Sequence, residues 1–288
     1  MNFYVDMTIL QNFPLQGKHH KPILTDLFYN KTASKKPLVI FCHGYKGYKD
    51  WGVFGRMNDT FTDHGFALLK FNFSHNGGTI EQPIDFPDLD TFGKNNYTME
   101  LDDLQIVIDW ITENEKHQEE IDTNNITLIG HSRGGGIVTL TAAKDPRIKQ
   151  LVTWAAVSTL DRTMFHEGPE LEQWKKDGVF YIVNGRTKQQ MPHYIQFYEN
   201  YKEHMDFLDV QKAAEKIVIP HLIVHGDGDL AVPIHHAKNL HQWNPNSEPY
   251  VIPGANHVFG AKQPWTENTF PKDFQEVLNK TFNFLKIY

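Results

Sequence analysis

The sequence contains three short segments whose residues could together perform nucleophilic catalysis. The first, Gly130-His-Ser-Arg-Gly134, matches the pattern Gly-x-Ser-x-Gly and has Ser132 at its centre. A serine hydroxyl is a poor nucleophile unless a base takes its proton and a carboxylate orients that base. The second segment holds two acids, Asp227 and Asp229, and the third holds His257. We therefore predict a catalytic triad of the serine, the histidine and one of the two acids.

The residues around Ser132 favour a strand, a tight turn and a helix in immediate succession. The run Ile126 to Ile129 is apolar and of strand length, and a helical pattern follows from Arg133. Gly-x-Ser-x-Gly alone is a weak pattern, but in this context its glycines allow the close backbone approach that a sharp turn requires. A helix that begins after the serine also directs free N–H groups at it, and these favour the anion that develops during attack on a carbonyl.

The other two segments also follow apolar runs of strand length. The two acids come after His221 to Val224, and the histidine comes after Tyr250 to Ile252. Stretches with apolar residues at spacings of three and four, such as Leu101 to Ile111, alternate with these runs. Repeated strand-and-helix units predict an α/β fold with a mostly parallel sheet and helices on both faces. The runs interpreted as strands are Ile23 to Tyr29, Leu38 to Cys42, Ala67 to Phe73, Ile126 to Ile129, Leu151 to Val157, His221 to Val224 and Tyr250 to Ile252.

Two stretches break this alternation. Residues 74–97 are polar and rich in Gly, Pro and Asp, and they exceed the usual connection of about 4–6 residues. From Ser158 to Lys216 the chain passes through charged and aromatic residues and reaches the next strand only at His221. We expect residues 158–216 to form a small cap, inserted before the strand that leads to the catalytic acid, within a single domain of residues 1–288.

These motifs, in this order, resemble the α/β-hydrolase fold serine hydrolases, in particular the dienelactone-hydrolase-like and feruloyl-esterase-like branch that is related to prolyl-oligopeptidase-type catalytic domains. In that family serine, acid and histidine follow one another along the chain. The acid commonly stands in a Gly-x-x-Asp-x-x-Val-Pro context, which Gly226 to Pro233 matches. The resemblance therefore assigns the acid to Asp229 and leaves Asp227 a role in the turn. His257 matches the family's Gly-x-x-His pattern.

The resemblance also implies an oxyanion hole built from two backbone N–H groups. One belongs to the residue after the nucleophile, Arg133, and the other to a loop after an early strand. In this chain the strand Leu38 to Cys42 runs into His-Gly-x-x-Gly, and Tyr45 is the expected donor. In the family, the histidine of that motif has a structural role. The residues that we expect to contact the substrate are His43, Gly44, His131 and Trp174.

The composition argues against several other classes of protein. The 288 residues include 28 basic and 35 acidic side chains, a net charge of −7 without a basic stripe, so we expect no nucleic-acid partner. No run approaches the roughly 18 apolar residues of a membrane helix, and the first ten residues do not resemble a secretory leader. We therefore expect no membrane partner and a cytoplasmic location. Sixteen histidines suggest a metal, but no ligand motif connects them, so we expect neither metal nor cofactor.

The reaction that these residues predict is acyl transfer from a small-molecule carboxylic ester through an acyl-enzyme. The resemblance implies aromatic, feruloyl-type or short acyl groups. Three alternatives stay open: an acylpeptidase or aminopeptidase of the prolyl-oligopeptidase type, a haloperoxidase or thioesterase that uses the same triad, and a non-catalytic binding protein on this fold. The peptidases usually carry a large additional domain before the hydrolase core, for which the residues before Leu38 leave little room. The oligomeric state also stays open, with a homodimer as one alternative.

Overall fold

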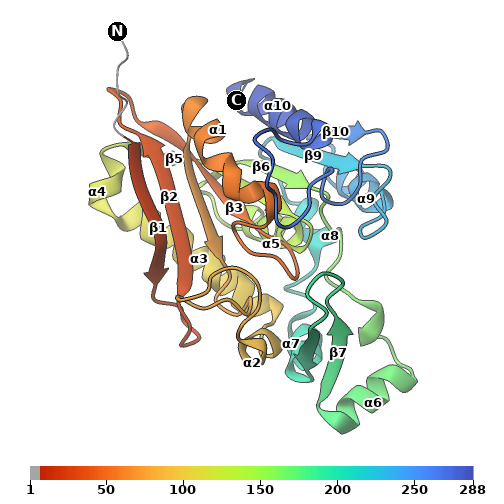
Figure 1. Cartoon of the computed structure of the whole chain (residues 1–288). Coiled ribbons are helices and arrows are strands. Elements are labelled where there is room, and N and C mark those ends of the chain that lie inside the picture. Colours follow the sequence, from red (N-terminus) through yellow and green to blue (C-terminus); the bar gives the residue numbers. More distant parts are fainter. Residues whose placement is uncertain (1–6, 288) are drawn as a thin grey trace.

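A central sheet of eight strands organises the molecule. The computed structural model describes residues 7–287. The strand order is β1-β2-β4-β3-β5-β6-β9-β10 (Figure 1). β1 and β2 pair antiparallel with their neighbours, whereas the strands from β4 to β10 pair in parallel. The strands are β1 (Met7–Leu15), β2 (Ile23–Asn30), β3 (Lys36–Cys42), β4 (Ala67–Asn72), β5 (Ile121–His131), β6 (Ile148–Trp154), β9 (His221–Gly226) and β10 (Ser247–Ile252).

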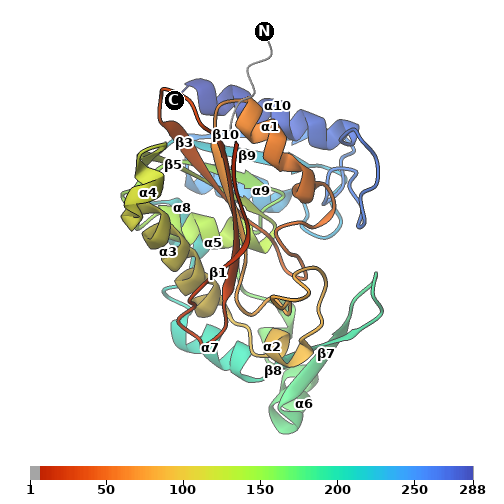
Figure 2. The ribbon, with the colours of Figure 1, turned by 60° about the vertical axis from the view of Figure 1, so that its left-hand side comes forward.

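Helices cover both faces of this sheet (Figure 2). On one face Leu104 of α3, Ile137 of α5 and Leu240 of α9 belong to one buried apolar cluster. On the other face the short 3₁₀ helix η1, α1 and α10 bury residues such as Phe61 and Phe274 in a second cluster. The elements are η1 (Gly52–Arg56), α1 (Met57–Asp63), α2 (Leu89–Gly93), α3 (Tyr97–Glu113), α4 (Glu115–Gln118), α5 (Arg133–Ala142), α9 (His235–Trp243) and α10 (Lys272–Ile287).

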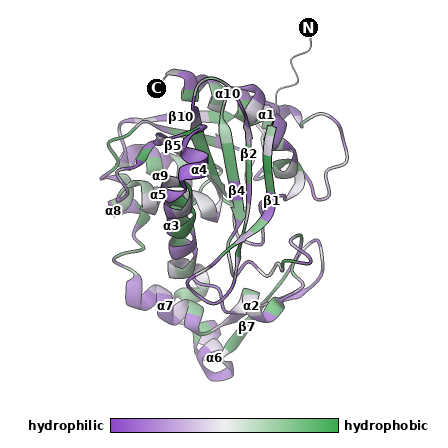
Figure 3. Cartoon of the chain, turned by 90° about the vertical axis from the view of Figure 1, so that its left-hand side faces the viewer, coloured by the Kyte–Doolittle hydropathy of each residue, from purple (hydrophilic) through white to green (hydrophobic). Residues whose placement is uncertain are grey.

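The hydropathy of the strands explains this layering. Residues Leu38 to Cys42 of β3 are all fully buried, as expected for a strand covered on both faces. Figure 3 shows the central strands as mainly hydrophobic and an outer helix, α7 (Gln196–His204), as mainly hydrophilic. The predicted fold class, α/β with a mostly parallel central sheet and helices on both faces, is confirmed.

An insertion lies between β6 and β9, where the sequence predicts a cap at residues 158–216. We call this insertion the cap. It contains an antiparallel hairpin of β7 and β8 that extends away from the sheet (Figure 1). Phe165 forms the centre of an aromatic cluster, with ring centroids 6.3 Å from Trp174 and 5.2 Å from Phe197. At its end, α8 contacts α5 of the main core. The elements are η2 (Thr163–Phe165), α6 (Pro169–Asp177), β7 (Val179–Val183), β8 (Gln190–Tyr194), α7 (Gln196–His204) and α8 (Val210–Ala214).

The strand predicted at Leu151 to Val157 lies three residues earlier in the structure, as β6. The chain leaves the sheet at Ala155, which has a φ of 45°. The sequence patterns did not identify β1, because a register shift between Leu10 and Phe13 interrupts its alternation. They also missed α10, and the long segment 74–97 contains the short helix α2.

Candidate active site

Three residues that the sequence singles out come together at the carboxyl ends of three parallel strands. Ser132 directly follows β5, Asp229 follows β9, and His257 follows β10. The Nε2 atom of His257 is 3.0 Å from Ser132 Oγ, and its Nδ1 atom is 2.8 Å from Asp229 Oδ2. A hydrogen-bonded chain thus joins the carboxylate, the imidazole and the hydroxyl. This arrangement allows an imidazole to take a proton from a serine.

The backbone at Ser132 is strained. Its φ of 57° and ψ of −120° lie outside the regions that L-residues usually adopt. The turn also brings backbone segments unusually close together: a Cβ on Gly44 would lie 2.8 Å from the Cβ of Ser132, and a Cβ on Gly134 would lie 2.5 Å from the carbonyl oxygen of Cys42. Only glycine fits these two positions without displacing the backbone around the serine.

Asp229 is held in place by backbone N–H groups. Its Oδ1 atom accepts hydrogen bonds from the N–H groups of Ala231 and Val232, both at 2.8 Å, so that Oδ2 faces His257. Burial alone would raise the pKa of Asp229, but the hydrogen bonds from His257 and Val232 lower it overall. The other acid, Asp227, accepts a hydrogen bond from the N–H of Gly254 at 2.5 Å. Asp227 therefore joins two loops, whereas Asp229 contacts the histidine.

Two further histidines border the site in their neutral form. His43 accepts a hydrogen bond at Nε2 from the N–H of Phe73 (3.2 Å) and donates from Nδ1 to the carbonyl of Gly44 (2.9 Å). Burial lowers its pKa to about 4. His131 donates from Nε2 to the carbonyl of His257 at 2.9 Å, and burial lowers its pKa to about 3. Both rings therefore position the backbone around the site.

The two expected oxyanion-hole residues lie close to Ser132. Arg133 begins α5, and Tyr45 lies in the loop after β3, beside Gly44, which contacts the serine. Among the turn, loop and cap hydrogen bonds between backbone groups of residues 7–287, neither of their N–H groups is a donor. Donors at a helix N-terminus and in such a loop can bind an oxygen that becomes negatively charged.

The side chains of these two residues connect the core with the cap. The Nη1 atom of Arg133 is 2.9 Å from Glu100 Oε1, and both side chains are buried. The Arg133 guanidinium carbon lies 4.4 Å from the centroid of the Tyr45 ring. The Tyr45 hydroxyl reaches His193 of β8, with 2.9 Å between the oxygen and Nε2. Tyr45 thereby contacts the core through its ring and the cap through its hydroxyl.

A cavity of about 220 Å³ opens beside Ser132 and His257. His43, Gly44 and His131, which the sequence predicts to contact the substrate, line it. Trp174 does not: its side chain is buried in the cap, where its indole N–H donates to the carbonyl of His193 at 2.8 Å. The other lining residues are Tyr45, Lys46, Gly47, Trp51, Phe54, Asn184, Arg186 and Val258.

Two lining residues, Asn184 and Arg186, come from the cap and were missed by sequence reasoning. They lie at the turn between β7 and β8, and Arg186 forms an ion pair with Asp85 in the segment 74–97. The two stretches that break the strand-and-helix alternation thus meet at the cavity. The dipeptide Asn184-Gly185 directly after the apolar run Val179–Val183 is a turn signal that could have identified this turn.

Within residues 7–287, no group of three or more His, Cys, Asp or Glu side chains is arranged to hold a metal ion. The adjacent histidines His235 and His236 stack on each other, with ring centroids 4.3 Å apart. Among the helices of the same residues, none is both long enough and apolar enough to span a membrane.

Comparisons with known proteins identify the fold family of the chain. A family model described as the alpha/beta hydrolase fold matches residues 37–189, more than half of the chain. An uncharacterized 31.7 kDa protein of Escherichia coli from the traX-finO intergenic region is 32% identical over 139 residues, which cover 48% of this chain and 44% of that protein. The chain therefore matches less than half the length of this relative.

Two further proteins are similar over nearly the whole chain. Non-heme chloroperoxidase CPO-A1 of Kitasatospora aureofaciens is 24% identical over 301 residues, covering 88% of this chain and 96% of that protein. The structure of Est1E from Butyrivibrio proteoclasticus with bound ferulic acid superposes with a TM-score of 0.69 at 19% identity. That superposition covers 93% of this chain and 96% of Est1E. It shows that the two proteins share a fold.

Proposed function

Because this chain belongs to the α/β-hydrolase fold family, we propose that it is a serine hydrolase that cleaves carboxylic esters through Ser132, His257 and Asp229. The observation that carries the proposal is the continuous hydrogen-bonded chain from carboxylate to imidazole to hydroxyl. The strained turn at the serine and the two N–H groups beside it support the same reaction. A hydrolase needs these groups together, whereas a binding protein on this fold would not.

In the first half of the proposed reaction, His257 takes the proton of Ser132 while Oγ attacks the ester carbonyl carbon. The carbonyl oxygen becomes negatively charged and is bound by the N–H groups of Tyr45 and Arg133. The protonated imidazole is stabilised by Asp229, which stays ionised. When the tetrahedral intermediate collapses, the bond to the alcohol oxygen breaks and His257 gives its proton to the departing alkoxide.

The second half repeats these steps with water. His257 takes a proton from a water molecule, whose oxygen attacks the acyl-enzyme carbonyl, and the same two N–H groups bind the oxyanion. Ser132 then leaves with the proton from His257, and the carboxylic acid is released. No group outside the triad and the oxyanion hole is needed to complete this cycle.

The cavity favours a small acyl group. A volume of about 220 Å³ accommodates a short acyl chain or one aromatic ring. The side chains of Trp51 and Phe54 give it an apolar wall, while Asn184 and Arg186 add polar groups from the cap. Est1E, which binds ferulic acid in its solved structure, has the same fold. We propose short-chain or aromatic-acid esters as substrates.

Two measurements test the proposal. A fluorophosphonate probe should label the wild-type chain at Ser132, and p-nitrophenyl acetate should be hydrolysed. Ser132→Ala should abolish the labelling and reduce turnover by at least about 10³-fold. Ser158→Ala is a matched control, because Ser158 is also buried and its Oγ lies 2.9 Å from a histidine nitrogen, Nδ1 of His236. Retained turnover in Ser132→Ala, or equal losses in both variants, would contradict the assignment.

A second candidate reaction is halogenation without a metal cofactor, because a relative named as a non-heme chloroperoxidase aligns with 88% of this chain. On the same triad, the acyl-enzyme would react with hydrogen peroxide instead of water and release a peracid, which oxidises halide. An assay with acetate, peroxide and bromide would detect it. A peroxide-dependent rate above the rate of ester hydrolysis would favour this second reaction, and rapid cleavage of aminoacyl p-nitroanilides without ester cleavage would favour a peptidase.

A further inference from the structure

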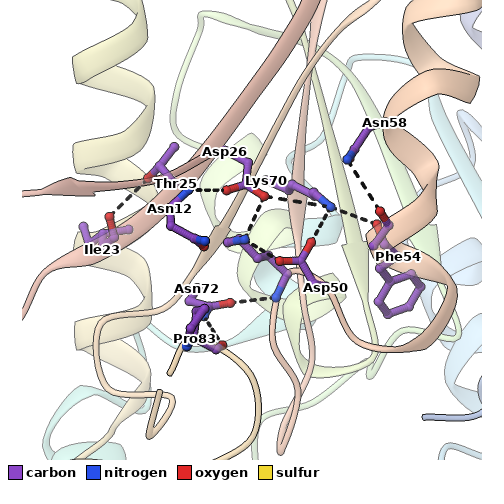
Figure 4. A network of polar contacts seen from close by, with 12 residues as sticks. Asn12, Ile23, Thr25, Asp26, Asp50, Phe54, Asn58, Lys70, Asn72 and Pro83 are labelled. Carbon is purple, nitrogen blue, oxygen red and sulfur yellow. Dashed lines mark hydrogen bonds and ion pairs between the residues drawn. The ribbon is translucent and has the colours of Figure 1, made fainter. Parts of the chain in front are cut away.

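Four charged side chains form a compact cluster beneath the loop that carries Tyr45. They are Asp26 of β2, Lys49 and Asp50 of the loop after β3, and Lys70 of β4. Figure 4 shows three of them, Asp26, Asp50 and Lys70, pointing toward one another between the strands and the loop. We call these four residues the charge cluster. None of them touches Ser132 or His257, so the reaction proposed above does not use them directly.

The contacts within the charge cluster are close and continuous. The Nζ atom of Lys49 donates to Asp26 Oδ2 at 2.7 Å and also to the carboxylate of Asp50. The Nζ atom of Lys70 donates to Asp50 Oδ1 at 2.6 Å and to the carbonyl of Phe54 at 3.1 Å. Asp26 and Lys70 stand opposite each other in the antiparallel pair of β2 and β4, with 4.0 Å between their charged atoms. Each lysine thus contacts both acids.

Burial makes this arrangement costly unless every charge has a partner. The side chains of Asp26 and Lys70 are 0% exposed and that of Lys49 is 1% exposed, while Asp50 remains 23% exposed. Burial of an unpaired charge costs several kcal/mol, and a buried pair compensates that cost only with good geometry. Two lysines and two aspartates balance each other here. Burial tends to raise the pKa of Asp50, but Lys70 and Lys49 lower it overall. For the two fully buried members burial outweighs their partners: it raises the pKa of Asp26 and lowers the pKa of Lys70.

The charge cluster holds one end of the loop that contains the expected oxyanion donor. Lys49 and Asp50 follow Tyr45 by four and five residues, and the backbone N–H of Lys49 donates to Asn72 Oδ1 at 2.7 Å. The carbonyl of Gly47 also accepts a hydrogen bond from Asn76 Nδ2 at 3.2 Å. β3 fixes the start of the loop, and the charge cluster fixes its end. The backbone between them, including the N–H of Tyr45, therefore has little freedom to move.

We propose that Asp26, Lys49, Asp50 and Lys70 are positioning residues for the oxyanion hole: their mutual ion pairs hold the loop so that the Tyr45 N–H points at the developing oxyanion. This inference rests on the proposed function. An apolar filling of the same space would anchor the chain without directional contacts. Ion pairs and charge-assisted hydrogen bonds fix both distance and direction. Electrostatic stabilisation of an oxyanion depends on donors held at about 2.7–3.1 Å from the oxygen, so small displacements weaken it.

The test removes one positive and one negative charge together. In Asp26→Asn/Lys49→Met the remaining Lys70 and Asp50 still pair and the buried charges still balance. The introduced asparagine also keeps an acceptor for the N–H of Asn12, which bonds Asp26 at 2.7 Å. We expect kcat on p-nitrophenyl acetate to fall about 10- to 100-fold with KM within about threefold. The reason is that the weakened contact, from the Tyr45 N–H to the oxyanion, exists mainly in the transition state. The affinity for phenylboronic acid, which forms a tetrahedral adduct with the serine, should fall by a similar factor.

A matched control exists at the opposite end of β3. Lys36 is also a buried lysine, and its Nζ atom pairs with Glu120 Oε2 at 2.6 Å, far along the strand from the loop. Lys36→Met/Glu120→Gln also removes one positive and one negative charge, but it leaves the charge cluster unchanged. It should leave kcat and boronic acid affinity within about twofold of the wild type, even where its thermal stability falls as much as that of the test variant.

Each outcome decides the proposal. A folded Asp26→Asn/Lys49→Met with wild-type kcat and boronic acid affinity would overturn it, and so would an equal loss in the control. If the double variant does not fold, Asp50→Asn replaces it, since this side chain is partly exposed and asparagine keeps its size and one acceptor. Asp50→Asn should lower kcat at least about threefold, and an unchanged kcat would overturn the proposal. A wild-type chain that neither hydrolyses the ester nor reacts with the fluorophosphonate would instead overturn the proposed function, and this inference with it.

Discussion

The loop from His43 to Trp51 is anchored in two different ways. At its far end, Lys49 and Asp50 belong to a cluster in which two positive and two negative charges pair inside the core. At its near end, the ring of Tyr45 lies among cations: the guanidinium carbons of Arg133 and Arg162 are 4.4 and 4.8 Å from its centroid, and Lys46 Nζ is 5.1 Å away.

The two ends also differ in what balances their charge. In the charge cluster each lysine contacts two aspartates. Within residues 7–287, the three cations around Tyr45 have one ion pair, that of Arg133 with Glu100. The Tyr45 side chain is linked to the cap by a hydrogen bond between its hydroxyl and His193. Burial, together with Arg133 and Arg162, lowers the pKa of His193 to about 3, so this bond joins two neutral groups. The end of the loop at Lys49 and Asp50 is therefore fixed by paired charges, whereas the end at Tyr45 depends on Glu100 and on weaker contacts.

The largest effect is expected when Glu100 is changed. Glu100→Gln keeps the size of the side chain but leaves the buried guanidinium of Arg133 without a negative partner, which should lower the free energy of unfolding by about 3 kcal/mol. Urea denaturation monitored by tryptophan fluorescence measures this. Glu172→Gln is the matched control, since Glu172 pairs with Lys175 at the exposed surface of the cap. A loss as small as that in the control would show that the cations around Tyr45 do not need this carboxylate.

A second prediction compares two buried acids. Asp50, beside two lysines, has a lowered pKa, but burial raises the pKa of Asp103 to about 7 although the N–H of Ser74 donates to it at 2.7 Å. Because the folded chain holds the Asp103 proton more tightly than the unfolded chain, this group contributes stability below about pH 4. That contribution is lost as the pH rises toward 7.

In the wild type, ionisation of Asp103 should lower the free energy of unfolding by up to about 1.4 kcal/mol per pH unit between about pH 4 and 7. In Asp103→Asn this decrease should be absent. Thermal unfolding measured between pH 5 and pH 8 would detect it, with Asp206→Asn as an exposed control, because Asp206 pairs with a lysine and not with a histidine. If the two variants have parallel pH profiles, the buried carboxyl of Asp103 is ionised throughout this range, and its contrast with Asp50 disappears.

Local patterns in the sequence were sufficient to predict the parallel sheet, Ser132, His257 and two candidate acids. The choice of Asp229 over Asp227 came from the family resemblance. Ser132, Asp229 and His257 each follow an apolar run, and parallel strands end at the same edge, so their proximity follows from topology. The glycines around the serine were informative because positions where two backbone segments approach closely require glycine.

The charge cluster and the cap side of the cavity could not be predicted in the same way. Asp26 and Lys70 lie 44 positions apart in the sequence and meet only because β2 and β4 pair in one particular register. That register cannot be derived from a single sequence. Two local signs were present: a lysine within the apolar run Ala67 to Phe73 and an aspartate within the apolar run Ile23 to Tyr29. A charge within an apolar run is a conflict of the kind that marks functional or structurally special positions. Trp174 was predicted to contact the substrate because it is aromatic, but its side chain is buried in the interior of the cap.

The smallest effect is expected at the hydroxyl of Tyr45, where the cap end can be weakened without changing charge. Tyr45→Phe keeps the backbone N–H and the aromatic ring among the cations, and removes only the hydrogen bond to His193, so the free energy of unfolding should fall by about 1 kcal/mol. Because the expected oxyanion donor is the backbone, kcat on p-nitrophenyl acetate should stay within about threefold. Tyr194→Phe is the control, because it removes an exposed tyrosine hydroxyl that donates a hydrogen bond to Asp90 Oδ1 at 2.9 Å. A tenfold or larger fall in kcat for Tyr45→Phe alone would mean that the contact with the cap, as much as the charge cluster, holds the loop in its active position.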